Sequence, residues 1–205
     1  EPIEEIAKII KAKNPNTIFH VDAIQAYGKL PIIPKNMGID LLSTSGHKIH
    51  GPKGIGFLYI KEGTKISPII FGGGQQKGMR SGTENVPGIV GLAVACEKMI
   101  GKKYENAEKI REVKEYFQER IKEIEDIKDN SGKAPHVASI SFKKLRSEVL
   151  LHALEDREIY VSSGSACSSN KKQAVSGTLN AIALSDEFKD GTLRFSFSIE
   201  NTKEE

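Results

Sequence analysis

The sequence predicts an α/β fold in which a partial, mostly parallel sheet is followed by a small α+β domain. Short, continuous apolar runs alternate with helical or loop segments over the first part of the chain, which is typical of parallel strands buried on both faces. Two of these runs end directly at polar residues, the place where open α/β sheets bind their ligands. A change of composition near Gly101, from apolar to mixed charge, marks the boundary between the two parts.

The first part is predicted to contain one helix and three strands. Residues 2–13 carry isoleucines on one face at helical spacing. After the turn "NPNT", the apolar run "TIFHV" predicts a buried strand that ends at Asp22. A second run, "IDLLST", leads into "SGHK" at 45–48, and "GIGFLYI" predicts the third strand. Because Asp22 and Lys48 both follow strand ends, we expect them to share a site.

The second part follows a glycine-rich loop, "FGGGQQKGMRSGTENVPG", and an apolar helix, "IVGLAVACEKMI". A long helix of mixed charge is predicted from about Lys103 to Asp126. Strands are predicted in "HVASISF", "IYVSSG" and "TLRFSFS", and a further helix at 146–157. We therefore divide the chain into residues 1–100 and residues 101–205.

Composition and charge argue against several classes of protein. The 30 basic and 27 acidic residues are interspersed, whereas nucleic-acid-binding proteins cluster their positive charge, so we expect no nucleic-acid partner. The sequence has no apolar run of membrane-spanning length and no signal peptide, so no membrane association is expected. Only two cysteines occur, in unlike surroundings, which favours a reducing, cytoplasmic location over a disulfide framework.

Lys48 is the first candidate for chemistry. A lysine held near other polar groups can react as a neutral amine and form a Schiff base with a carbonyl, above all with pyridoxal phosphate. The plainer interpretation is a solvent-exposed loop lysine. A phosphate-binding loop fits poorly, because Pro52 stands where that motif needs its lysine and no Ser or Thr follows Lys53.

Asp22 and Gln25 strengthen the Schiff-base hypothesis. A carboxylate at the end of a buried strand can keep a pyridine nitrogen protonated, which makes the ring an electron sink. Gln25 follows within the same helical turn. Taken alone, an aspartate after a strand is more often a helix cap. Asp22 and Gln25, followed later in the sequence by "SGHK", are much less expected to occur together by chance.

In the remaining sequence, Cys167 and Arg194 are candidates for function, whereas Cys96 is not. Cys167 lies among small polar residues in "SSGSACSS", which predicts an exposed, mobile loop with a reactive thiol. Cys96, in an apolar helix, is typical of a buried cysteine without a role. Arg194 could clamp a carboxylate or form a structural salt bridge. The five histidines show no spacing that fits a metal site.

Four segments together resemble one family: "HVDAIQAYGK", "STSGHKIHGPKGIGFLYI", "GGGQQKGMRSGTENVPGIVG" and "SSGSACSS". They are similar to the pyridoxal-phosphate-dependent cysteine desulfurases of the NifS/IscS type, within the class V aminotransferases. The resemblance covers essentially the whole chain. It implies a type I aminotransferase-like fold, a homodimer, and removal of sulfur from L-cysteine to give L-alanine and a persulfide.

The resemblance also implies a role for each matching residue. Lys48 would bind pyridoxal phosphate covalently and move protons on the substrate, and Cys167 would attack the substrate sulfur and carry the persulfide to a sulfur-acceptor or iron–sulfur scaffold protein. Arg194 would bind the substrate carboxylate. The remaining cofactor contacts would be Asp22 on the pyridine nitrogen, Gln25 on the ring hydroxyl, Ser45 and His47 on the phosphate, and Thr83 on the phosphate in the partner subunit.

The family pattern extends beyond both ends of this chain, so we interpret the sequence as a fragment that lacks an N-terminal part and the C-terminal end. The residues that stack on the ring and complete the cofactor cradle in the family have no counterpart in it. Two alternatives remain open at this point. One is a selenocysteine lyase or sulfinate desulfinase on the same scaffold, and the other is a non-catalytic fragment that binds a sulfur acceptor.

Overall fold

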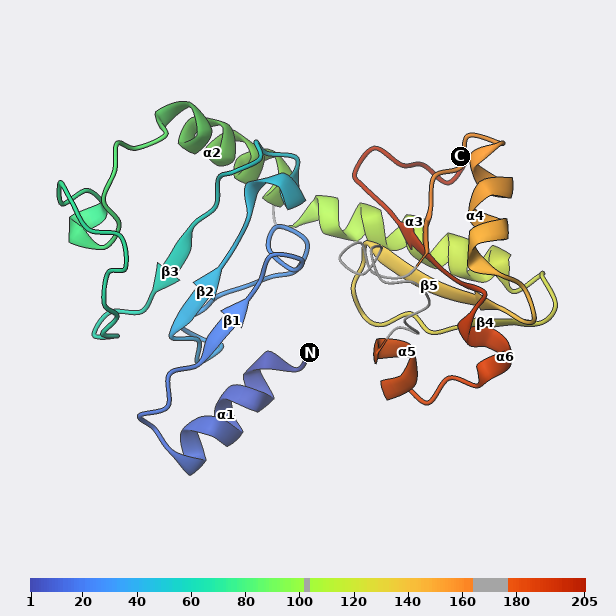
Figure 1. The fold of residues 1–205 in the computed structure, drawn as a ribbon, viewed down its shortest axis with the longest axis horizontal. Helices are drawn as coiled ribbons and strands as arrows, with labels where there is room; N and C mark the ends of the chain where they lie inside the picture. The colour runs from blue at the N-terminus through green and yellow to red at the C-terminus, as the bar shows by residue number, and fades with distance from the viewer. Residues whose placement is uncertain (102–103, 164–176) are drawn as a thin grey trace. The chain divides into compact units, whose positions relative to one another are not determined.

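The computed structural model describes residues 1–101, 104–163 and 177–205, and it divides the chain into two compact units, Glu1–Glu105 and Asn106–Glu205 (Figure 1). Each unit contains its own sheet. None of the helices among the described residues is long and apolar enough to cross a membrane.

The sheet of the first unit has three strands in the order β1-β2-β3. They are β1 (His20–Asp22), β2 (Leu41–Ser43) and β3 (Leu58–Ile60). β1 and β2 run parallel, with Asp22 opposite Ser43. β3 runs antiparallel to β2, so this part of the sheet is mixed where the sequence predicts mostly parallel strands. The link from β2 to β3 holds the short helix η1 (Gly46–Ile49).

The helices of the first unit are α1 (Ile3–Lys13), the short helix η2 (Gln76–Gly78) and α2 (Val86–Ile100), and the predictions for α1 and α2 agree with them. Asn85 begins α2 by accepting a hydrogen bond from the Gly88 amide. The sheet core is small: Ala23, Ile39 and Leu42 are almost fully buried together. Small strands with so little core depend on polar contacts at their ends.

Asp40 supplies the main polar contact of this kind, at the start of β2. Its carboxylate accepts hydrogen bonds from Lys11 of α1, from the Phe19 amide before β1 at 2.8 Å, and from Lys61 after β3 at 3.4 Å. Burial acts to raise the pKa of Asp40, but these donors together outweigh it and hold the pKa below its ordinary value. One carboxylate thus ties a helix and three strands together.

The second unit has an antiparallel sheet in the order β4-β5-β7-β6. Its strands are β4 (Ile127–Asp129), β5 (Val137–Phe142), β6 (Ser162–Ser163) and β7 (Thr192–Ser196). Its helices are α3 (Glu105–Ile121), α4 (Ser147–Glu155), α5 (Gly177–Ala181) and α6 (Asp186–Lys189). α3 ends at Ile121, earlier than the predicted Asp126, and the chain reaches β4 through a turn in which Asp126 has a φ of 57°.

Aromatic stacking attaches α3 to one face of this sheet. The Phe117 ring lies 4.7 Å from the Phe195 ring and 5.4 Å from the Phe197 ring, centroid to centroid. Lys114, on the same helix, is 5% exposed and donates to the carbonyls of Gly132 and Ala134, both at 2.8 Å. The helix is therefore held by apolar and by polar contacts.

Replacing Asp40 with asparagine is expected to destabilise the first unit by about 1–3 kcal/mol, because three donors lose a charged acceptor. Since the folded-state pKa of Asp40 is lowered, its stabilising effect is present above the ordinary aspartate pKa and is lost as the pH falls through the folded value. Urea denaturation at neutral and acidic pH measures this. The exposed Glu62→Gln is the control, and equal effects of the two variants would contradict the role given to Asp40.

Candidate active site

The candidate site lies at the carboxyl ends of β1 and β2. Parallel pairing places Asp22 opposite Ser43, and the Ala23 amide donates to the Ser43 carbonyl at 2.9 Å. Beyond these two ends the chain forms a turn on one side and the loop with η1 on the other. Asp22 and Lys48 thus come from neighbouring strand ends.

The loop that carries Lys48 is held by its own backbone. The Gly46 amide donates to the Ile55 carbonyl at 2.8 Å, and the Gly51 amide donates to the Gly46 carbonyl at 2.9 Å. The Ser45 hydroxyl and His47 Nδ1 form a hydrogen bond of 2.7 Å. His47 is exposed, and Lys48 is half-buried. A hydroxyl and an imidazole are therefore paired beside the lysine.

On the other strand end, Asp22 accepts a hydrogen bond from the Ile24 amide at 2.9 Å through one carboxylate oxygen. The residue is exposed, and so is Gln25 in the following turn. This local bond fixes the carboxylate and leaves its second oxygen available to a ligand. The segment that follows Asp22 is a turn and not a helix, so Asp22 is not the helix cap of the plainer interpretation, and its carboxylate remains accessible.

The turn after Asp22 packs against η1 and α2. The Tyr27 hydroxyl lies 3.6 Å from the Cys96 sulfur of α2, and the Tyr27 ring contacts Phe57 edge to face. Burial, chiefly, raises the pKa of Tyr27 and keeps its phenol neutral. Gly28 follows with φ of 76°, and a side-chain carbon there would lie 3.0 Å from atoms of Ile49 and Met99.

The structure adds one site residue that sequence reasoning missed. Lys29 follows Gly28 and is 7% exposed, although lysines are normally solvated. Burial, and next the positive charge of Lys48, lower the pKa of Lys29 to about 8. The dipeptide Gly-Lys after an aromatic residue looks like an ordinary surface turn in the sequence, so no pattern signalled it.

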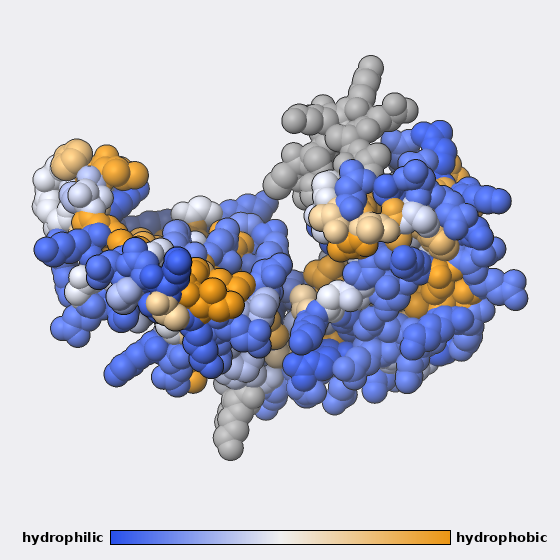
Figure 2. Space-filling view, turned by 90° about the horizontal axis from the view of Figure 1, so that it is seen from below, coloured by the Kyte–Doolittle hydropathy of each residue, from blue (hydrophilic) through white to orange (hydrophobic). Residues whose placement is uncertain are grey.

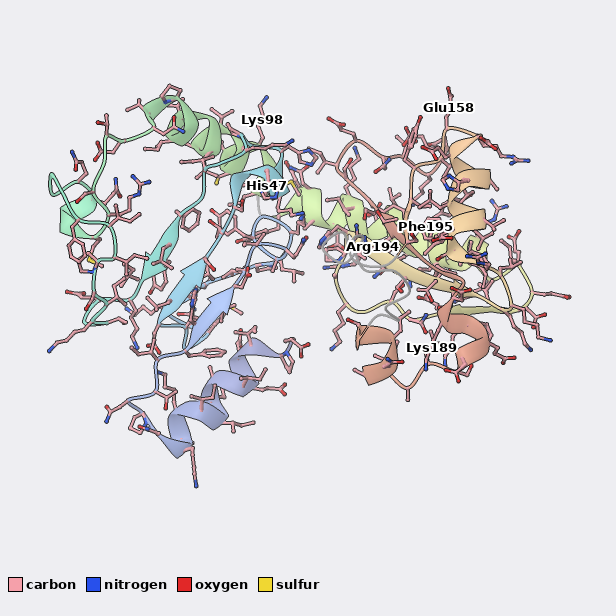
Figure 3. All side chains as sticks on the ribbon, in the orientation of Figure 1. His47, Lys98, Glu158, Lys189, Arg194 and Phe195 are labelled. Atoms are coloured by element: carbon pink, nitrogen blue, oxygen red, sulfur yellow. The ribbon has the colours of Figure 1, made fainter. Side chains whose placement is uncertain are left out.

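Two further predicted residues belong to other parts of the chain. Thr83 is exposed just before α2, and no hydrogen bond or ion pair within the described ranges joins it to Asp22 or Lys48. Arg194 lies on β7 in the second unit and donates to the Ser162 hydroxyl at 3.2 Å (Figure 3). Its Nε atom is buried and has no hydrogen-bond partner among the described residues.

The structure describes one of the two cysteines. Cys167 lies outside the described residues. Cys96 is a half-buried thiol on α2 with Tyr27 beside it. Among residues that the structure describes, no group of three or more His, Cys, Asp or Glu could hold a metal ion.

Replacing Gly28 with alanine is expected to loosen the contact between the turn and η1. The change costs about 1 kcal/mol for the positive φ and about 1–3 kcal/mol more for the clash with Ile49 and Met99. Gly54→Ala is the matched control, because Gly54 has φ of 77° and no atom within 4 Å of an added carbon. Urea denaturation compares them, and an equal loss of stability would show that the close packing at Gly28 is unimportant.

Comparison with known proteins identifies relatives of the whole chain. The aminotransferase class-V family matches residues 1–205. The cysteine desulfurase IscS of Dictyoglomus turgidum is 41% identical over 209 residues, which cover 100% of this chain and 52% of that protein. The chain thus spans about half the length of the curated relatives it matches.

Solved structures agree with these relatives. A NifS-like protein superposes with a TM-score of 0.87 at 35% identity, over 99% of this chain and 53% of that one. SspA in complex with cysteine superposes with a TM-score of 0.74 at 34% identity, over 98% of this chain and 55% of that one. The predicted α/β fold of the type I aminotransferases and the resemblance to the cysteine desulfurases are confirmed. The chain belongs to the aminotransferase class-V family.

Proposed function

We propose that the chain is part of a cysteine desulfurase, which converts L-cysteine to L-alanine and transfers the sulfur to Cys167 as a persulfide. The observation that carries this proposal is the meeting of Asp22 with the Ser45–Lys48 segment at two parallel strand ends. The curated relatives named cysteine desulfurase, and the solved complex of SspA with cysteine, support the same reaction.

The side chains at the strand ends fit pyridoxal phosphate in their chemistry. Asp22 offers a carboxylate to a protonated pyridine nitrogen, and Gln25 offers an amide to the ring hydroxyl. The Ser45 hydroxyl and the His47 imidazole, 2.7 Å apart, offer donors to a phosphate. Lys48 supplies the amine. When bound, the cofactor would supply an aldehyde that condenses with amines and a ring that withdraws electrons from the substrate.

In this proposal Lys48 moves the substrate protons. Lys48 lies in a loop whose backbone is held by hydrogen bonds at Gly46 and Gly51, so the position of its backbone is fixed. Its half-buried environment lets the amine reach a ligand while the loop limits solvent around it. The Nζ atom of Lys48 is therefore the proton carrier of the site.

Arg194 would bind the carboxylate of cysteine. One guanidinium nitrogen donates to Ser162, whereas the buried Nε atom has no partner among the described residues. A buried donor without an acceptor is costly, and a substrate carboxylate would satisfy it. This favours the carboxylate clamp over the structural salt bridge that the sequence left open, since no ion pair of Arg194 occurs within the described ranges.

The proposal extends to domains and partners. Residues 1–100 would form part of the large cofactor-binding domain, and residues 101–205 the small domain that carries Cys167, in a cytoplasmic protein. The Cys167 persulfide would pass to a sulfur-acceptor or iron–sulfur scaffold protein. A homodimer is supported by apolar side chains that the first unit leaves exposed, including Ile69 at 88% and Phe71 at 80%. Hydrophobic side chains reach the surface in the view of Figure 2.

Covalent trapping tests the cofactor assignment. With added pyridoxal phosphate and borohydride, the label is expected on Lys48, because the loop presents this amine beside the Ser45–His47 pair. Lys48→Ala is expected to lose the label, and Lys53→Ala, an exposed lysine of the same loop, to keep it. Peptide mapping gives the result. Label spread over surface lysines would overturn the assignment.

Cysteine turnover tests the reaction, in the protein that carries this chain. Cys167→Ser is expected to lower sulfide release from L-cysteine at least about a hundredfold, because a hydroxyl is a far weaker nucleophile for sulfur than a thiolate. Cys96→Ser is the control and is expected to change it less than about twofold, since Cys96 belongs to the packing of α2. Undiminished release by Cys167→Ser, or release only from cysteine sulfinate or selenocysteine, would contradict the proposal.

A further inference from the structure

Arg194 has a serine opposite it on each neighbouring strand of the second sheet. In the register of the strands it pairs with Ser139 of β5 on one side and with Ser162 of β6 on the other. Directly opposed residues of antiparallel strands point to the same face of the sheet, so the three side chains form one row. Both flanking positions hold a neutral hydroxyl group, which can accept a hydrogen bond from the guanidinium and cannot neutralise its charge.

Ser162 is the serine that contacts the guanidinium. Arg194 Nη2 donates to the Ser162 hydroxyl oxygen at 3.2 Å. Ser139 is held instead by the loop before β5, because its amide donates to the Ser131 hydroxyl at 3.0 Å. One nitrogen of the guanidinium is thus fixed to β6 by a neutral acceptor.

Fixing one nitrogen restricts the orientation of the whole guanidinium group. The group is planar and carries five N–H donors in a fixed arrangement. With Nη2 bound to Ser162, the remaining donors can point in few directions. One of them, Nε, is buried and has no partner among the residues that the structure describes. A carboxylate is bound best by two parallel N–H groups, so a guanidinium that is already oriented loses less entropy when it binds one.

We propose that Ser162 is a positioning residue for substrate binding: its hydroxyl holds the Arg194 guanidinium so that the other N–H groups are directed at the α-carboxylate of an amino-acid substrate. The proposal rests on the proposed function, in which Arg194 binds that carboxylate. Ser162 contacts the arginine and not the reacting atoms. Loss of its hydroxyl therefore weakens binding of the carboxylate and leaves the chemical step unchanged.

A purely structural role for Ser162 predicts a different result. β6 consists of Ser162 and Ser163, and both residues pair with β7. If the hydroxyl served only to hold this short strand in place, its removal would weaken the binding of every ligand of the site. A positioning role affects only ligands that carry a carboxylate. Ligands that differ in this one group therefore separate the two roles.

Ser162→Thr and Ser162→Val are the matched variants, because threonine and valine have similar shapes and both favour strands, and only threonine keeps the hydroxyl. In the protein that carries this chain, titration calorimetry measures the binding of L-alanine and of L-alaninamide, which lacks the carboxylate. Relative to Ser162→Thr, Ser162→Val is expected to weaken L-alanine binding by about threefold to thirtyfold and L-alaninamide binding by less than about twofold.

Two further variants control this comparison. Ser163→Ala removes a hydroxyl from the same strand on the opposite face of the sheet, and it is expected to leave both dissociation constants unchanged. Ser162→Ala removes the hydroxyl of Ser162 without adding bulk. Compared with the wild-type protein, it is expected to show the same loss as Ser162→Val, and it decides the matter if the larger side chains do not fit.

Turnover gives the second readout. Ser162→Val is expected to raise the KM for L-cysteine by the factor found for L-alanine, with kcat within about twofold of that of Ser162→Thr. Equal L-alanine binding by the two variants, or an equal loss for L-alanine and L-alaninamide, would overturn the positioning role and leave the proposed function intact. A wild-type protein that releases no sulfide from L-cysteine and still shows the L-alanine difference would overturn only the proposed function.

Discussion

The parallel pairing of β1 with β2 is the constraint on which the rest of the candidate site depends. Parallel strands end at the same edge of a sheet, so the residues that leave Asp22 and Ser43 must turn away beside each other. A slip of one residue would turn the side chains of the shifted strand to the opposite face of the sheet, so the register is as important as the direction. Three residues per strand form few hydrogen bonds, and the Asp40 carboxylate compensates by holding α1, β1 and β3 to the start of β2.

Lys114 and Lys29 are both buried, and the burial of a positive charge costs free energy in each case. Lys114 donates to two carbonyl oxygens, so its charge is satisfied and its role is to hold α3 to the loop before β5. Lys29 has no such acceptor in the described part of the chain, and burial lowers its pKa to about 8. A buried ammonium group without an acceptor costs free energy, and burial therefore favours its neutral form. Lys114 therefore holds its helix as a hydrogen-bond donor, whereas the structure gives Lys29 no such contact in the described residues.

Much of the fold and part of the site could be predicted from the sequence. Asp22 and Lys48 were recognisable because each follows an apolar run, and strand ends are where such sheets bind ligands. Lys29 was not, because its burial arises from tertiary packing, which no spacing in the sequence records. The direction of β3 could not be predicted, because the apolar run "GIGFLYI" indicates a strand and does not show whether that strand pairs parallel or antiparallel.

Arg194 and Phe195 are neighbours on β7, so their side chains lie on opposite faces of the sheet. Phe195 faces α3, so its neighbour Arg194 lies on the opposite face of β7, where the helix does not cover it. On that face Arg194 pairs across the strands with Ser162 of β6, and Cys167 follows β6 in the chain. The proposed carboxylate clamp and the proposed sulfur nucleophile are therefore linked by one strand pair. In the proposed reaction, the substrate carboxylate would bind at Arg194 of β7, the strand that pairs with β6. The segment with Cys167 follows β6 in the sequence.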